Sequence, residues 1–263
     1  MPEPASAPAD PTTPPTDEFY IGYAPKAPPA VARRTRLIVA AYVLFSMIIA
    51  TVCVAFIKPT GDGVWEDGSF KSFTGTLLKK PYPIIILDKP LADGVGSTAL
   101  LVDFGKRGAQ QRVQSLSGRV RVTGTTLHRD GRGMIELAPD PDAIAELKSE
   151  AAILPSFARD ITPVTLRGEI VDPKCFLGAM KPGEGKTHKA CAIRCISGGI
   201  PPTLVCWDAQ GNSTYFVLAD ESGNPACDLF LDVIGQPVEV TGTLARLGDL
   251  MFLLARRQDV HPL

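Results

Sequence analysis

The sequence has no excess of charge of either sign, and it is poor in histidine. Its 27 lysines and arginines are matched by 28 aspartates and glutamates, and only three histidines occur in 263 residues. A protein that binds nucleic acid through its overall charge needs a basic surface, and this composition does not supply one. We therefore expect no nucleic-acid partner.

Common catalytic and cofactor motifs are also absent. The sequence contains neither Cys-x-x-Cys nor Cys-x-x-Cys-His, which argues against a thioredoxin-like redox motif and against covalently attached haem. Residues 183–187 (GEGKT) resemble a phosphate-binding loop, but Met180 stands where that loop requires glycine. No Ser/His/Asp arrangement or carboxylate pair can be argued from spacing. We therefore assign no catalytic residue and no organic cofactor site.

One long apolar segment is present. Residues 37–57 (LIVAAYVLFSMIIATVCVAFI) carry no charge, and a helix of about 20 residues spans the roughly 30 Å hydrocarbon core of a bilayer. Four basic residues precede the segment, whereas acidic residues soon follow it: Lys26, Arg33, Arg34 and Arg36 before, Asp62, Glu66 and Asp67 after. The positive-inside rule then predicts a cytoplasmic N-terminus and an exported C-terminal part. We expect a single-pass protein of the bacterial inner membrane, with the lipid bilayer as a partner and its C-terminal domains in the periplasm.

The exported part contains an internal repeat. Residues 120–137 (VRVTGTTLHRDGRGMIEL) and 238–254 (VEVTGTLARLGDLMFLL) share a Val-Thr-Gly-Thr strand, a glycine turn and a Met-led apolar strand. Upstream, each copy has a first strand with a central glycine, Gly75 or Gly168, and an alternating strand that ends at a glycine turn. Five short strands with a bend in the first predict an OB-like barrel, although a generic small barrel or sandwich fits the same pattern.

The expected fold class is therefore mainly β, with a single N-terminal transmembrane helix followed by two tandem small OB-like β-barrels. The predicted division is a disordered Pro-rich cytoplasmic tail (1–36), the transmembrane helix (37–57), a linker (58–72), the first OB-like β-domain (73–139), a helical linker (140–163) and the second OB-like β-domain with a Cys/His insertion (164–263). In the helical linker, Asp140 is expected to cap a short helix with Pro141 at its first position.

The spacing of the repeat locates the insertion. Gly75 and Gly168 are 93 residues apart, but Val122 and Val240 are 118 apart, so the second copy is 25 residues longer between these landmarks. Residues 175–200 fall in that interval and have about that length. The cysteine-rich segment is therefore predicted to be an insertion into a loop of a barrel, a place where function often lies.

The residue types of the insertion predict a metal site. Its candidate ligands are Cys175, His188, Cys191 and Cys195. A helix over residues 188–197, capped by Thr187, would place the last three on one face, and the glycine-rich loop would bring in the first. Four such ligands suit a closed tetrahedral zinc site, and the nearby Met180 leaves Cu(I) open as well. The expected cofactor is thus zinc or copper.

A disulfide framework is the alternative, because exported cysteines usually pair. Five cysteines follow the apolar segment, and this odd number leaves one thiol free if only disulfides form. A Cys206–Cys227 disulfide together with the metal site would account for all five. The competing arrangement has two disulfides and one free thiol, with Cys175 joined to Cys191 or to Cys195. A disulfide between Cys191 and Cys195 has poor geometry because both lie on one helix. Both interpretations stay open on the sequence.

The second copy also resembles a known group of proteins. The strand GEIVDPKCFLG, the His-x-x-Cys-x-x-x-Cys segment and the closing V-x-V-T-G, within residues 165–257, are similar to small exported bacterial OB-fold-like proteins of largely uncharacterised function. On that resemblance the shared set is Cys175, His188, Cys191 and Cys195, whereas Cys206 and Cys227 are additions. The resemblance implies a fold and export rather than an activity.

These features predict a membrane-anchored periplasmic protein with a Cys/His metal or redox site. It would serve as a non-catalytic accessory or assembly subunit of a membrane complex, with other subunits of that complex as partners. One alternative is a thiol-based oxidoreductase or metal chaperone that uses Cys191 and Cys195 as an exchangeable pair. Another is a structural interaction module whose cysteines form disulfides only.

Overall fold

The computed structural model describes residues 27–56, 63–148 and 157–263. The chain divides into two compact units, Met1–Pro59 and Thr60–Leu263. Most of the predicted Pro-rich tail and parts of both predicted linkers lie outside the described residues.

The first unit contains the helix α1 (Pro29–Phe56). Proline suits the first helical position because its missing N–H would have no partner there. None of the side chains of α1 is buried, and the helix is long and apolar enough to cross a membrane. It begins before the apolar segment, so that Arg33, Arg34 and Arg36 lie on its first turns.

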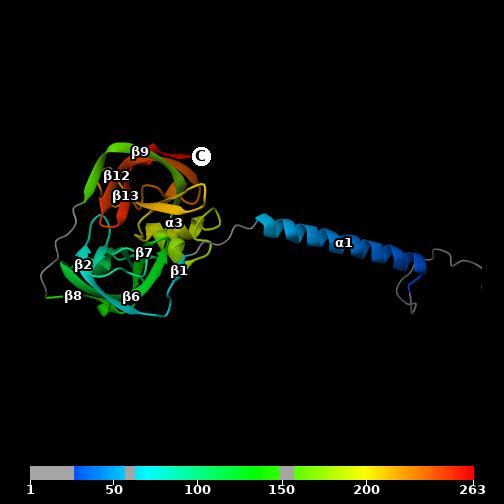
Figure 1. Ribbon diagram of the computed structural model, residues 1–263, viewed down its shortest axis with the longest axis horizontal. Coiled ribbons are helices and arrows are strands. Elements are labelled where there is room, and N and C mark those ends of the chain that lie inside the picture. The colour runs from blue at the N-terminus through cyan, green and yellow to red at the C-terminus, as the bar shows by residue number, and fades with distance from the viewer. Residues whose placement is uncertain (1–26, 57–62, 149–156) are drawn as a thin grey trace, which may run out of the picture. The chain divides into compact units, whose positions relative to one another are not determined.

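Two β-sheets and several short helices make up the described part of the second unit (Figure 1). The first sheet contains β1 (Val64–Trp65), β2 (Lys71–Leu78), β3 (Ile84–Leu87), β4 (Thr98–Asp103), β5 (Arg107–Gly108), β6 (Arg119–Arg129), β7 (Arg132–Leu137) and β8 (Ile144–Glu146). The second contains β9 (Ala158–Val171), β10 (Thr203–Trp207), β11 (Ser213–Ala219), β12 (Pro237–Leu247), β13 (Leu250–Leu254) and β14 (Val260–Pro262). The short helices are α2 (Gln110–Val113), η1 (Pro141–Ala143), η2 (Cys175–Ala179), α3 (Lys189–Ser197), η3 (Leu231–Val233) and η4 (Arg257–Asp259).

The two sheets repeat one pairing pattern. In the first, β2 pairs with β3 and β6, β3 pairs with β4, β4 runs parallel to β7, and β7 pairs with β6, which closes a circuit of strands. In the second, β9, β10, β11, β13 and β12 make the same antiparallel and parallel pairings in the same order. Each sheet is therefore barrel-like, and the internal repeat predicted from the sequence is confirmed.

Gly75 and Gly168 occupy equivalent points of this circuit, in β2 and β9. A Cβ atom on Gly75 would lie 2.3 Å from the carbonyl oxygen of Ile86, and one on Gly168 would lie 2.0 Å from that of Val205. Any side chain at these points would collide with the backbone of the neighbouring strand. Glycine is therefore required in both first strands for the next strand to cross closely.

The helix predicted after Asp140 is reduced to a single turn, η1, over the described residues. Asp140 does cap one turn, since its carboxylate accepts the backbone N–H of Asp142 at 2.8 Å, and Pro141 begins that turn. The chain then extends as β8 and pairs with β6, with Ile144 opposite Val122. Pairing with an existing sheet and burial of Ile144 outweigh the weak intrinsic stability of so short a helix. The later part of the predicted helix lies outside the described residues.

The two sheets share a hydrophobic core. Leu127 of β6 and Phe252 of β13 belong to one buried cluster, together with Phe176 from the segment that joins β9 to β10. The fully buried Tyr82 belongs to the same cluster, and its hydroxyl donates to the carbonyl of Leu218 at 2.7 Å and accepts the N–H of Ala226 at 2.8 Å. A side chain from the first sheet thus satisfies backbone groups of the second half, so the two barrel-like sheets pack as one unit.

We expect Tyr82→Phe to destabilise the second unit by about 1–3 kcal/mol, because it leaves a buried carbonyl and a buried N–H without their partner. The free energy of unfolding can be measured in urea by tryptophan fluorescence on the detergent-solubilised chain. Tyr215→Phe is the matched control, because Tyr215 is also a buried tyrosine but its hydroxyl forms no hydrogen bond with another described residue. Equal losses in the two variants would contradict a bridging role for Tyr82.

Candidate metal centre

The cysteine-rich segment is an insertion between the first two strands of the second sheet. Residues 172–202 join β9 to β10, whereas residues 79–83 alone join β2 to β3 at the equivalent place in the first sheet. The insertion carries η2 and α3, and Figure 1 shows α3 between the two sheets. The position of the cysteine-rich insertion, in a loop of the second copy of the repeat, is therefore as predicted.

The insertion begins with Asp172, which directly follows β9 and is fully buried. One carboxylate oxygen of Asp172 accepts the backbone N–H of Cys175 at 2.9 Å, and its backbone carbonyl accepts the N–H of Phe176 at 3.1 Å. These bonds turn the chain sharply at the end of the strand. The turn holds Cys175 at the start of η2, with its side chain buried.

The second cysteine-bearing element is α3, which lies where the sequence predicts a helix. His188 stands at its N-cap instead of Thr187, and the backbone carbonyl of His188 accepts the N–H of Ala192 at 3.0 Å. The backbone N–H of Gly198 caps the other end by reaching the last turn. Cys191 and Cys195, four residues apart, therefore project from adjacent turns of one face.

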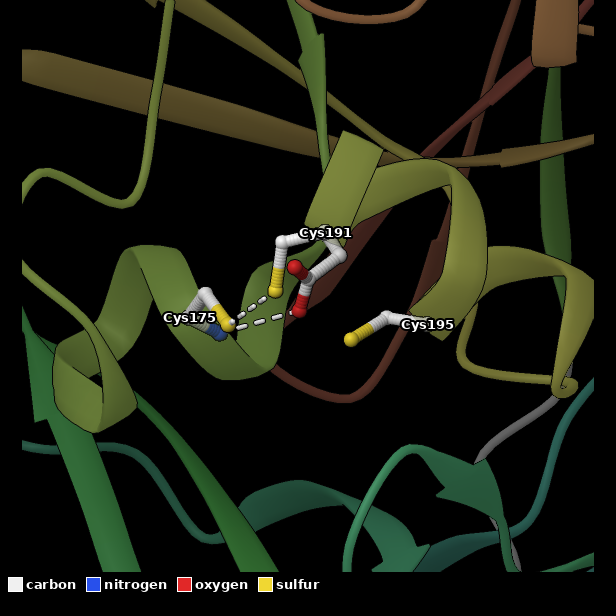
Figure 2. Close-up of side chains that lie close together, drawn as sticks. Cys175, Cys191 and Cys195 are labelled. Atoms are coloured by element: carbon white, nitrogen blue, oxygen red, sulfur yellow. Dashed lines mark hydrogen bonds between the residues drawn. The ribbon is translucent and has the colours of Figure 1, made fainter. Parts of the chain in front are cut away.

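These elements bring four ligand-type atoms together. One ligand atom each from Asp172, Cys175, Cys191 and Cys195 lies within 4.8 Å of the others. Figure 2 shows the side chains of the three cysteines converging from η2 and α3. The sulfurs of Cys175 and Cys191 are 3.9 Å apart. Tetrahedral coordination with metal–sulfur bonds of 2.3 Å places sulfurs about 3.8 Å apart, so this spacing suits a zinc ion.

The sequence predicts His188 as the fourth ligand, but it is not among the four residues whose ligand-type atoms cluster. Its Nε2 lies 3.0 Å from a carboxylate oxygen of Asp172, and both side chains are buried. The fourth ligand-type atom of the cluster is thus a carboxylate oxygen of Asp172, and the imidazole of His188 contacts that carboxylate. Histidine–carboxylate contacts of this kind orient ligands in many metal sites.

A cation from the first sheet also reaches the cluster. Lys106, in the turn between β4 and β5, donates from Nζ to the sulfur of Cys191 at 2.8 Å. The turn is fixed to the insertion, because Gly108 N–H donates to the Gly198 carbonyl at 2.9 Å and Gln110 donates to the Gly199 carbonyl at 2.7 Å. The first barrel-like sheet therefore supplies positive charge beside three sulfurs and a carboxylate.

Further contacts hold the insertion against the first sheet. The guanidinium of Arg129 lies 4.0 Å from the ring centroid of Phe176. Lys174 and Glu136, both buried, form an ion pair at 2.6 Å. A broken buried pair leaves an uncompensated charge, so these contacts strongly favour one docked position of η2.

The pKa values of Cys175 and Cys195 are shifted in opposite directions. The pKa of the Cys195 thiol is lowered, chiefly because Cys175 donates a hydrogen bond to its sulfur, with help from the Lys106 charge. The same contact, with burial, raises the pKa of Cys175. The pKa of Lys106 is raised by its bond to Cys191. Metal ligation requires thiolates, so a cation that binds these sulfurs would release the remaining thiol protons.

Cys206 and Cys227 lie apart from the cluster, and no disulfide occurs among the cysteines, all of which are in described residues. Burial raises the pKa of each thiol to about 11. Cys227 donates to the carbonyl of Ile200 at 3.6 Å, and Cys206 packs against the core of the second sheet. The Cys206–Cys227 disulfide therefore stays a prediction, and both residues serve here as core thiols.

Sequence reasoning missed Asp172 and Lys106 as members of the site. A signal existed for Asp172, which stands three residues before Cys175 at the end of a strand, where its carboxylate can cap the turn. No local signal marks Lys106, because it belongs to the other copy of the repeat, 85 residues before Cys191.

Comparison with known proteins gives no relative: the chain matches no protein-family model, no curated protein and no solved structure.

Substitutions at Asp172 and His188 can identify the fourth ligand. We expect Asp172→Asn to weaken zinc affinity more than His188→Gln, because the first removes a charged ligand and the second removes only its hydrogen-bond partner. Loss of such a partner typically costs about 10–100-fold in metal affinity. Affinities can be measured by competition with a chromophoric chelator on the solubilised chain. The reverse order would make His188 the ligand, as the sequence predicts.

Lys106→Gln should also weaken metal binding, by about 10-fold or more, because it removes a positive charge that contacts a ligand sulfur. Lys106→Arg should retain more of the affinity, since it keeps the charge. Lys79→Gln is the matched control, because Lys79 is an exposed lysine of the same half and, among the described residues, donates a hydrogen bond only to the Gln114 carbonyl. The same affinity for the Lys106→Gln and Lys79→Gln variants would show that the first sheet does not tune the site.

Proposed function

We propose that this protein is an exported accessory subunit that is anchored in the membrane. It binds one thiophilic metal ion, preferably zinc, in a Cys3Asp site. The observation that carries the proposal is the convergence of Asp172, Cys175, Cys191 and Cys195 within 4.8 Å. Three thiolates select soft or borderline metals, and a carboxylate as the fourth ligand suits zinc better than Cu(I).

The site favours a structural or storage role over catalysis. Catalytic zinc sites keep one position open for water or substrate, whereas four protein ligands close the coordination shell. Three of the four ligand residues are buried, and Cys191 alone is partly exposed. A metal bound here would join η2 to α3 and stabilise the insertion between the two sheets.

The membrane anchor and the strand circuits support the rest of the proposal. The helix α1 is long and apolar enough to span a bilayer, and basic residues cluster on its N-terminal side. The positive-inside rule supports a second unit outside the cytoplasm, which in a Gram-negative bacterium is the periplasm. The circuit β2–β3–β4–β7–β6, repeated in the second sheet, is the order expected of OB-like barrels. It agrees with the resemblance to exported OB-fold-like proteins.

An accessory or assembly role in a membrane complex follows from this combination. A metal site closed by four protein ligands would stabilise the second unit and would leave no open coordination position for a substrate. The membrane-anchored second unit would then bind neighbouring subunits rather than catalyse a reaction. We expect those subunits, and the bilayer, to be its partners.

Elemental analysis of the full chain tests the metal site. The chain is purified in detergent under mildly reducing conditions and analysed for zinc and copper, and its thiols are alkylated before and after chelation. We expect about one zinc ion per chain, as in structural sites, with Cys175, Cys191 and Cys195 protected until the chelator is added.

Serine variants provide the controls for that measurement. Replacement of Cys175, Cys191 or Cys195 should abolish stoichiometric zinc, whereas Cys206→Ser and Cys227→Ser should retain it. Copper in place of zinc would change the identity of the metal and not the site. A wild-type chain that binds neither zinc nor copper after reduction would refute the proposal. It would favour the alternative of a structural interaction module without a metal.

A further inference from the structure

The sulfurs of Cys175 and Cys191 are neighbours from two different elements. They are 3.9 Å apart, and they project from η2 and α3 (Figure 2). Two side chains that approach from separate segments can adopt the dihedral angle near 90° that a disulfide requires, once the sulfurs move together by about 2 Å. Cys191 and Cys195 share one helix, where that angle is hard to reach.

The three cysteines also differ in their access to solvent. Cys175 and Cys195 are 6% and 1% exposed, whereas Cys191 is only half-buried. Its sulfur contacts the ammonium group of Lys106, which itself lies at the surface. A reagent from solution would therefore reach Cys191 first, and the buried sulfur of Cys175 lies 3.9 Å from the Cys191 sulfur.

We propose that the metal-free site carries out thiol–disulfide exchange, with Cys191 as the entry sulfur and Cys175 as the resolving sulfur. The substrate class is a disulfide, either of a small thiol or of another exported polypeptide. This activity goes beyond the metal-binding role and differs from the sequence-based alternative, which paired Cys191 with Cys195.

The chemistry balances within the pair and its substrate. The Cys191 thiolate attacks one sulfur of the substrate disulfide, forms a mixed disulfide and releases the first substrate thiol. The substrate thiolate released in this first step takes the proton of the Cys175 thiol. The Cys175 sulfur then attacks the Cys191 sulfur, forms the Cys175–Cys191 bond and releases the second substrate thiol. Two protein thiols lose two protons and two electrons, and the substrate disulfide takes them up to become two thiols. The reverse sequence oxidises substrate thiols.

Metal binding and exchange exclude each other at this site. Both use the sulfurs of Cys175 and Cys191, so a disulfide between them removes two of the four metal ligands. Cys195 and Asp172 remain, and they are too few to fill a tetrahedral shell. The occupied metal site is thus the protected form of the pair, and release of the metal exposes it to exchange.

Disulfide mapping of the full chain tests the inference. The detergent-solubilised chain is reduced, stripped of metal with a chelator and exposed to oxidised glutathione, and its peptides are then analysed by mass spectrometry. We expect one reversible disulfide, Cys175–Cys191, in the wild type and in Cys195→Ser. Cys175→Ser should instead accumulate a glutathione adduct on Cys191, because the resolving sulfur is gone.

Two further measurements make the outcome decisive. Zinc-loaded chain should form the disulfide at least about 10-fold more slowly than stripped chain, because both sulfurs are then coordinated. Cys206→Ser should behave like the wild type and controls for general effects of serine. A dominant bond between Cys195 and either partner, or no adduct on Cys191 in Cys175→Ser, would overturn the inference.

The result is separable from the metal proposal. A reduced chain that binds no metal but forms the Cys175–Cys191 bond would refute the metal site and support exchange. A chain that binds zinc but gives no such bond after stripping would do the opposite. Far-ultraviolet circular dichroism of each variant confirms that the sheets are intact when the thiols are counted.

Discussion

The cysteine site depends on one buried carboxylate. Asp172 is fully buried, and its two oxygens are engaged in different directions, one by the N–H of Cys175 and the other by the imidazole of His188. The first contact sets the start of η2 and the second sets the start of α3. Because a buried carboxylate is costly unless its oxygens are bonded, both contacts strongly favour a single arrangement of the two elements. The sulfurs of Cys175 and Cys191 meet as a consequence of that arrangement.

The first barrel-like sheet completes a site to which it contributes no cysteine. Its β4–β5 turn carries Lys106 to the sulfur of Cys191, and the bond between Gly108 and Gly198 holds that turn against the end of α3. The hydroxyl of Tyr82 joins the two halves within the shared core. The two copies of the repeat therefore have different roles at this site. The second copy carries the cysteines, and the first packs against them and supplies the positive charge of Lys106.

The sequence predicted the features that depend on local pattern. The apolar segment, the repeated strands and the helix over Cys191 and Cys195 all follow from spacing within one element or one copy, and the structure has them. The helix expected after Pro141 failed because β6 offered a sheet edge to Ile144, a partner that no local pattern reveals. His188 as a ligand stays a prediction. Helical spacing puts it beside the cysteines, but in the structure its ring contacts Asp172, a carboxylate at the end of β9 that no helical spacing reveals.

Five cysteines follow the apolar segment, and on the sequence alone this odd number sets a metal site against a disulfide framework. The geometry of the structure divides the five into two groups. Cys206 and Cys227 are core thiols, and the rise of their pKa to about 11 keeps them protonated and poor nucleophiles at neutral pH. The remaining three divide by position, because Cys175 and Cys191 can approach each other while Cys195 stays buried on the inner face of α3. A pair with one extra sulfur is what a site needs if it is to hold a metal through three thiolates and still close a single disulfide. Under the two proposals, the metal site and the disulfide would be two states of the same cluster, separated by whether a cation or a disulfide bond joins η2 to α3.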